Sequence, residues 1–343
     1  MNAILSRLDA LRDRLDLDRF GLDESASCVI FTPRFRTSRH VVALLIPRGA
    51  REPRVVVKMP RLEGDDDGIA REARVLRELR ETYPDASPSV PQVVAYADGD
   101  GDEDRPLLIE TALGGPLVTR ATLRAAPSQR VDEVVKWLIS LSSGPRASSE
   151  PFERLIAEPL TRFADLFPES APEGELVART LEAVEPLREA VVPRVIEHGD
   201  LSHPNLILLP SGRVGVVDWE LAEEDGFPLH DLSFFLAFAT FALRGCQRAD
   251  DYLAAFDDAF FSRGGWARSR VNGYVDALEL DEEVLTSLFV ACWARYTAQL
   301  VGRIGGGRPG LSEQDAAWVR DNRYYALWSH TLDHLGDLDW RRR

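Results

Sequence analysis

Apolar residues in the first third of the chain occur mostly in short runs that are separated by polar turns. Runs of this length, rich in Val, Ile and Leu, are typical of β-strands. Five strands are predicted, over residues 28–32, 40–46, 54–59, 92–97 and 106–111. Between the third and fourth runs the period changes to that of a helix, with apolar residues at Ile69, Ala73, Leu76 and Leu79. This part of the chain therefore predicts an antiparallel sheet with one key helix over about 69–82.

Helical patterns dominate the rest of the chain. An amphipathic helix is predicted over 2–16, and a break at Gly114-Gly115-Pro116 precedes a long helical region. The helices expected there cover about 129–141, 152–167, 175–190, 249–261, 267–278, 281–302 and 313–336. We therefore predict the α+β class, with a domain over 1–112 and a mostly helical domain over 113–343.

One stretch inside the helical region, Val195 to Glu220, reads as short strands with polar residues at their ends. The apolar runs 206–209 and 214–217 are separated by a Pro-Ser-Gly turn. A loop before the first run carries Asp200 and Asn205, and Asp218 ends the second run. Carboxylate and amide oxygens are ligands that Mg²⁺ prefers. Phosphoryl transfer also needs a carboxylate at the attacking hydroxyl group.

The order of these residues resembles the protein-kinase signature H-R-D-L-x-x-x-N followed by D-F-G. This chain has the octapeptide His198-Gly-Asp-Leu-Ser-His-Pro-Asn205, followed by Asp218-Trp219-Glu220. With Gly in place of Arg, the variant is similar to the aminoglycoside phosphotransferase and choline kinase-like family of the protein-kinase-like superfamily. The resemblance implies a two-lobed fold that binds a nucleotide. It also implies the reaction of ATP, or GTP, with an alcohol to give a phosphate ester.

Several roles follow from this resemblance. Asp200 is the candidate catalytic base, or the residue that orients the acceptor hydroxyl group. Asn205 and Asp218 are the candidate magnesium ligands. His198 and Asp231 are expected to support the catalytic loop, Asp231 by bonding the loop backbone.

A lysine and a glutamate complete the predicted nucleotide site. Only two of the 41 basic residues are lysines, and one of them, Lys58, ends the apolar run of the third strand. Glu72 lies four residues before Leu76, so it shares the apolar side of the predicted helix. A carboxylate aimed at the sheet needs a cation, and a Lys–Glu pair orients the nucleotide phosphates in kinases. We expect Lys58 and Glu72 to form this pair.

The resemblance also assigns residues that carry no chemical signature of their own. The loop after the first strand is expected to cover the phosphates, where Ser38 is the candidate contact although the loop has no glycine. Adenine is expected to bind the peptide groups of Glu110 and Ala112. Because such recognition uses the backbone, this assignment depends on the resemblance alone.

Composition narrows the choice of partners. The net charge of -15 argues against nucleic acid. No apolar run approaches the about 20 residues of a membrane span. The three cysteines have no metal-ligand spacing and are expected to be buried thiols in a reducing cytoplasm. A small-molecule acceptor is expected, such as a sugar or an amine-bearing alcohol, but the sequence does not identify it.

Three alternatives stay open at this point. A metal-dependent hydrolase would use His198, Asp200 and His203 as ligands. A non-catalytic pseudokinase would bind the nucleotide only. A protein kinase is disfavoured by Gly199 and by the absence of an A-P-E motif. The choice between ATP and GTP, the number of magnesium ions, the roles of His203 and Glu220 and the oligomeric state are not determined by the sequence.

Overall fold

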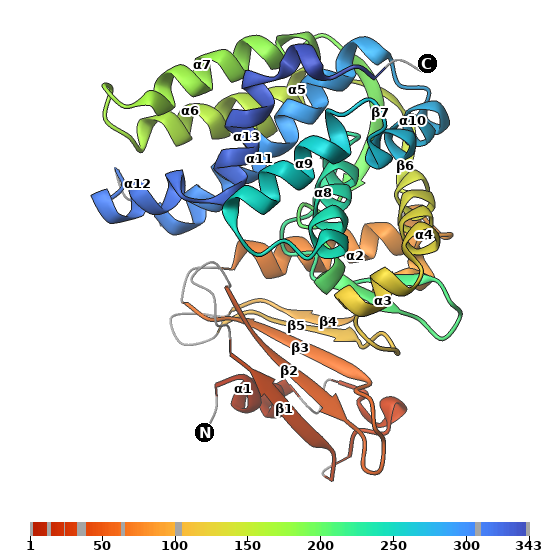
Figure 1. The fold of residues 1–343 in the computed structure, drawn as a ribbon. Coiled ribbons are helices and arrows are strands. Elements are labelled where there is room, and N and C mark those ends of the chain that lie inside the picture. Colours follow the sequence, from red (N-terminus) through yellow and green to blue (C-terminus); the bar gives the residue numbers. More distant parts are fainter. Residues whose placement is uncertain are drawn as a thin grey trace. The chain divides into compact units, whose positions relative to one another are not determined.

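The computed structural model describes residues 3–11, 15–23, 25–32, 39–62, 66–99, 105–305 and 310–340. The chain forms two compact units (Figure 1). Unit 1 contains residues 1–118 and 204–222, and unit 2 contains residues 119–203 and 223–343. An antiparallel sheet in the N-terminal region and a helical C-terminal part confirm the predicted fold class. The lobe boundary expected at residue 112 stays a prediction.

Unit 1 is built on a five-stranded antiparallel sheet with the strand order β1-β2-β3-β5-β4. The strands are β1 (Ser27–Phe31), β2 (His40–Ile46), β3 (Val55–Pro60), β4 (Val93–Ala97) and β5 (Leu107–Thr111). Their side chains alternate between the two faces. Val55, Val57 and Met59 of β3 are buried in a cluster with α1 (Ala3–Leu11). The other face carries Lys58 and α2 (Asp67–Thr82), which packs Ile69 and Ala73 against Leu108.

A hairpin from the middle of the chain completes unit 1. It consists of β8 (Leu206–Leu208) and β9 (Val214–Val216). The segment after β5 pairs with it: the Val118 N–H donates to the Leu206 carbonyl at 2.8 Å, and the Leu208 N–H donates to the Pro116 carbonyl at 2.9 Å. Gly115 makes this approach possible, since a Cβ atom there would lie 2.1 Å from the Leu208 oxygen. The hairpin therefore depends on a glycine with a φ of 121°.

Unit 2 is mostly helical and contains one small sheet with the order β10-β7-β6. The strands are β6 (Ser142–Ala147), β7 (Val191–Glu197) and β10 (Glu223–Gly226). The helices before the loop 198–205 are α3 (Arg120–Ala125), α4 (Pro127–Ile139), α5 (Ser149–Phe152), α6 (Glu158–Asp165) and α7 (Pro172–Val184), with a π-helical turn over Glu153–Ala157. The helices after it are α8 (His230–Arg244), α9 (Ala249–Phe260), α10 (Trp266–Leu278), α11 (Leu285–Gly305), α12 (Glu313–Arg320) and α13 (Arg323–Asp333).

Helix α11 forms the centre of unit 2 and packs against α6, α7, α8 and α13. Its Phe289 and Trp293 are fully buried, and both contact the ring of Phe256 in α9. The segment Glu282–Ile304 is long and apolar enough to cross a membrane, but 89% of its apolar window is buried inside the protein. Such burial is typical of a core helix.

Some elements differ from the sequence prediction. The helix expected over 313–336 is divided into α12 and α13, because Asn322 caps the second helix by accepting from the Tyr324 N–H at 2.9 Å. Helix α8 and strands β6 and β10 were not predicted. Cys28 is exposed on the edge strand β1, so the expectation of three buried thiols is wrong for this residue.

Candidate active site

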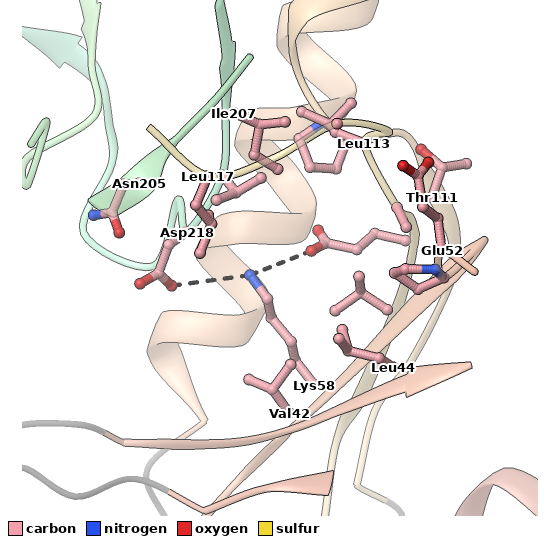
Figure 2. Close-up of a pocket in the computed structure, with 17 residues that line it drawn as sticks. Val42, Leu44, Glu52, Lys58, Thr111, Leu113, Leu117, Asn205, Ile207 and Asp218 are labelled. Atoms are coloured by element: carbon pink, nitrogen blue, oxygen red, sulfur yellow. Dashed lines mark ion pairs between the residues drawn. The ribbon is translucent and has the colours of Figure 1, made fainter. Parts of the chain in front are cut away.

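The predicted site residues are divided between the two units, so the site is described in two parts. Unit 1 holds a pocket with a cavity volume of about 380 Å³ (Figure 2). Its walls are mainly apolar: Val42 and Leu44 come from β2, Val56 from β3 and Ile207 from β8. An apolar slot with a few polar groups is the usual form of a cofactor or ligand site.

The polar end of the pocket is organised around the ammonium group of Lys58. Its Nζ atom lies 2.6 Å from Glu72 Oε1, 3.3 Å from Glu110 Oε1 and 3.9 Å from Asp218 Oδ1. Figure 2 marks the pairs with Glu110 and Asp218 by dashed lines. Burial lowers the pKa of the ammonium group, but the carboxylates of Glu110, Glu72 and Asp218 together raise it above its ordinary value. Lys58 is therefore a permanent cation in the pocket.

Glu72 connects α2 to both Lys58 and the Asp-Trp-Glu segment. Its side chain is fully buried, and Oε1 accepts from Lys58 Nζ and, at 2.9 Å, from the Trp219 N–H. The helical phase of Glu72 predicted the contact with Lys58, but not the one with Trp219. One carboxylate oxygen thus fixes the lysine and the backbone next to Asp218.

Asn205 and Asp218 both line the pocket that holds Lys58. The Val217 N–H donates to the Asn205 carbonyl at 3.0 Å, which ties the two segments together. Asp218 has a φ of 72°, a left-handed conformation that is uncommon for residues other than glycine. Backbone strain of this kind costs about 1–3 kcal/mol and is concentrated at functional sites.

The oxygens of Asn205 and Asp218 fit a hard cation. Magnesium is usually held by one or two carboxylates together with substrate phosphates and water. No group of three or more His, Cys, Asp or Glu side chains with metal-site geometry occurs among the described residues. His198, Asp200 and His203, the ligands of the hydrolase alternative, therefore do not form such a group in the described part of the chain.

Glu220 is in contact with the start of β2. Its Oε2 atom lies 2.7 Å from Nδ1 of the buried His40. Its backbone carbonyl accepts from Arg71 of α2 at 3.3 Å. Between Asp218 and Glu220, Trp219 is fully buried. Neither contact of Glu220 had a signal in the sequence, because both partners are far away along the chain.

Two of the residues assigned to the nucleotide make contacts that the sequence did not predict. Glu110 contributes a buried side chain to the pocket in addition to its peptide group. The Ala112 N–H donates to the Arg54 carbonyl at 2.9 Å, so its bond to adenine remains a prediction. Ser38 lies outside the described residues.

The part of the site in unit 2 is the loop that follows β7. The carboxylate of Asp231 accepts from the His198 N–H at 2.6 Å and from the Gly199 N–H at 2.9 Å. The Asp200 N–H donates to His198 Nδ1 at 3.2 Å. Gly199 has a φ of 81°, which lets the chain turn between the two neighbouring side chains. The side chains of Asp231 and His198 thus both accept hydrogen bonds from the backbone of the loop.

Charges and hydroxyl groups around the loop set its electrostatics. Burial, together with the charge of Glu197, raises the pKa of Asp231 to about 7, although its bonds to the loop N–H groups oppose the shift. Asp200 Oδ1 accepts from the hydroxyl group of Tyr296 at 3.2 Å. Tyr296 comes from α11, almost a hundred residues later, and was not predicted.

A buried ion pair lies directly before the loop. Glu197, the last residue of β7, accepts from Arg295 of α11 through both oxygens at 2.8 Å. It also accepts from the Phe227 N–H at 2.5 Å. The two charged side chains are only 2% and 1% exposed. This pair fixes the end of the strand from which the loop starts.

Phosphoryl transfer requires a cation on the nucleotide phosphates, oxygen ligands for magnesium and a carboxylate for the acceptor hydroxyl group. Residues of these kinds occur in both units, Lys58, Asn205 and Asp218 in unit 1 and Asp200 in unit 2. An antiparallel sheet and a helical unit that carry such residues are typical of phosphotransferases with a kinase-like fold. The family model described as "Phosphotransferase enzyme family" matches residues 37–274. The chain belongs to this family, and the predictions of the family and of a phosphotransferase that acts on a hydroxyl group are confirmed.

Solved structures agree with this fold. A protein from Ralstonia eutropha JMP134, described as a candidate aminoglycoside phosphotransferase, is 17% identical over 96% of this chain and 98% of its own, with a TM-score of 0.60. A thermostable mutant of APH(4)-Ia in a ternary complex with ADP and hygromycin B is 17% identical over 91% and 96%, with a TM-score of 0.54. A mutant of aminoglycoside 2'-phosphotransferase-IIIa in complex with GDP is 16% identical over 96% and 99%, with a TM-score of 0.53.

At this level of identity the likeness to these structures shows the fold alone. No curated protein sequence matches the chain significantly.

Proposed function

We propose that the protein transfers the γ-phosphoryl group of ATP to a hydroxyl group of a small molecule, with magnesium. The single observation that carries this proposal is the pocket of unit 1, where the Lys58–Glu72 pair, Asn205 and Asp218 lie along one apolar slot. The structures of relatives in complex with ADP or GDP support a nucleotide as co-substrate.

The contacts of each residue suggest its role in the reaction. Lys58, held by Glu72, would bind phosphate oxygens as a point charge. Asn205 and Asp218 would hold magnesium, which neutralises the charge on the phosphates. Asp200 would accept the hydrogen bond of the acceptor hydroxyl group, orient it for attack and receive its proton. Asp231 and His198 would keep the loop in the shape that this requires.

The acceptor belongs to the class of small alcohols. Hygromycin B in the complex of APH(4)-Ia supports an amine-bearing sugar as one candidate. The net charge of -15 is compatible with a cationic acceptor, although acidic proteins are common for reasons of solubility. The cytoplasmic location and the absence of nucleic acid and membrane as partners stay predictions.

The test is a thermal-shift titration of the full chain with ATP and GTP, with and without magnesium. A ligand of the folded state raises the melting temperature by mass action. We expect a magnesium-dependent shift that Asp218→Ala removes. The matched control Asp165→Ala, at an exposed position on α6, should keep the shift.

Turnover is then measured with a panel of alcohols. Asp200→Ala should keep the nucleotide-dependent shift but lose phosphorylation of any acceptor that the unmodified protein uses. A protein that binds nucleotide and modifies no acceptor, with or without Asp200, would support the pseudokinase alternative. Full activity of Asp200→Ala would show that this residue is not the base.

A further inference from the structure

Glu110 is an unusual group to find at the back of an apolar slot. It pairs with Val56 in the register of β5 and β3, so its side chain shares the face of the sheet that lines the pocket. The residue is only 2% exposed. Carboxylates are almost never buried to this extent unless they are paired.

The hydrogen bonds of Glu110 are incomplete. Oε1 lies 3.3 Å from Lys58 Nζ, whereas the buried Oε2 has no hydrogen-bond partner among the described residues. An unsatisfied buried polar atom is costly, and each such atom in a folded protein calls for an explanation. A hydrogen-bond donor on the ligand of the pocket would satisfy Oε2 and explain its position.

Nucleotide binding makes the need for a donor greater. Lys58 lies closer to Glu72, at 2.6 Å, than to Glu110. If nucleotide phosphates bind Lys58, its longer contact, the one with Glu110, is lost more easily than the contact with Glu72. Glu110 would then lie in an apolar slot, beside a planar base, with both of its oxygens in need of donors.

If the base enters the slot with its C6 position toward Glu110, adenine and guanine differ at the atom that meets this carboxylate. Adenine carries an amino group at C6, which donates, and guanine carries a carbonyl oxygen, which accepts. A carboxylate facing the C6 position therefore attracts adenine and repels guanine. We propose that Glu110 selects the base: its carboxylate accepts a hydrogen bond from the C6 amino group of adenine, so that the protein prefers ATP to GTP. This inference rests on the proposed function.

The experiment compares ATP with purine riboside 5'-triphosphate, which has hydrogen in place of the amino group. These two nucleotides and GTP are titrated calorimetrically with magnesium into the full chain. The titrations are run at about pH 8.5, because burial raises the pKa of Glu110 to about 8 and the ionised group only accepts. A hydrogen bond to a charged group predicts at least about tenfold tighter binding of ATP.

Two variants isolate the contribution of Glu110. Glu110→Leu should reduce the ratio of the two affinities to about one, since no acceptor remains. Glu110→Gln should keep part of the preference for ATP and bind GTP better, because its amide group can both accept and donate. Any general effect on Lys58 changes both affinities equally and leaves the ratio untouched. Glu81→Gln, at an exposed position of α2, is the control and should behave as the unmodified protein does.

The outcomes separate this inference from the function on which it rests. In one outcome, the unmodified protein and Glu110→Leu bind ATP and purine riboside 5'-triphosphate with the same ratio of affinities. This result would overturn the role of Glu110 and leave the proposed function intact. A preference for GTP that disappears in Glu110→Leu would show that the carboxylate reads guanine instead. A folded protein that binds none of the three nucleotides would overturn both proposals.

Discussion

Replacement of Arg295 by Met should destabilise unit 2 strongly. Arg295 and Glu197 are joined by two hydrogen bonds of 2.8 Å and are 1% and 2% exposed. Met fills a similar volume but has no charge, so Glu197 would remain buried with only the Phe227 N–H as a donor among the contacts described above. An unpaired buried carboxylate is the main source of the expected loss.

The size of the effect follows from the burial of the pair. Removal of one partner of a buried ion pair costs about 3–5 kcal/mol. Unit 2 has 206 residues. At about 2.1 cal/mol/K per residue, its unfolding entropy is about 0.43 kcal/mol/K. The melting temperature of unit 2 should therefore fall by about 7–12 °C.

Differential scanning calorimetry measures this shift, with circular dichroism to verify the fold. The control Arg162→Met removes a surface pair with Glu158, in which both side chains are more than 60% exposed, and should cost less than about 1 kcal/mol. The double variant of Arg295→Met with Glu197→Gln should recover most of the loss, because no buried charge is left. A single variant that melts like the control, or a double variant that loses as much as both single variants together, would refute the reasoning.

The same pair predicts a dependence on pH. Burial by itself would raise the pKa of Glu197. The charges of Arg295 and His230 and the hydrogen bonds outweigh this effect and lower the pKa from its ordinary value of 4.5 to about 2. Because the pKa is lower in the folded state, the stabilisation is complete above about pH 4.5 and is lost as the pH falls toward 2. Glu197→Gln should remove this part of the acid dependence in urea titrations.

Three further predictions concern other parts of the chain. Tyr296→Phe removes the hydroxyl group that donates to Asp200. It should lower kcat about tenfold and leave the nucleotide affinity unchanged. Reduced nucleotide affinity with a normal kcat would contradict a role of Tyr296 in orienting Asp200. Gly115→Ala should lower the free energy of unfolding by more than about 2 kcal/mol in calorimetry, because its Cβ would collide with a backbone carbonyl. Gly49 has a φ of 79° and open space around it, so Gly49→Ala should cost only about 1 kcal/mol. A thiol reagent should modify Cys28 in the native protein and the other two cysteines only after unfolding; rapid modification of all three would show that unit 2 opens readily.

The residues that the sequence predicted best are those whose environment is local. Lys58 ends a strand, and Glu72 has the helical phase of its apolar neighbours, so their contact follows from two short patterns. Asn205 and Asp218 lie next to the paired strands β8 and β9, and both line the pocket that holds Lys58. In such cases short stretches of the chain determine which side chains can meet.

Side-chain contacts that depend on long-range pairing were missed, including those of Glu110, for which only a role of the peptide group was expected from the sequence. The side chain of Glu110 enters the pocket because β5 pairs with β3 in one particular register, and a shift by one residue would point it to the other face. Tyr296 meets Asp200 only because α11 packs beside the loop. In the sequence, Glu110 and Tyr296 cannot be told apart from other glutamates and tyrosines, because neither belongs to a local motif.

Elements without contrast between polar and apolar positions were missed as well. Helix α8 buries almost every side chain, so its apolar residues form no stripe of helical period. Strand β6 contains Ser, Gly and Pro, which normally indicate a turn, and it is a strand only because β7 pairs with it. The periodicity of apolar residues reveals elements that are half buried. It does not reveal elements that are fully buried, or strands that form only because a neighbouring strand pairs with them.

The division of unit 1 into two chain segments has a consequence for biosynthesis. The sheet and α2 are encoded before residue 119, but the hairpin with Asn205 and Asp218 follows 85 residues later. When only the first segment has left the ribosome, the pocket is incomplete: its apolar wall is uncovered, and Asn205 and Asp218 are not yet synthesised. A ligand that contacts both segments can therefore assist the folding of this unit only after most of the polypeptide has emerged.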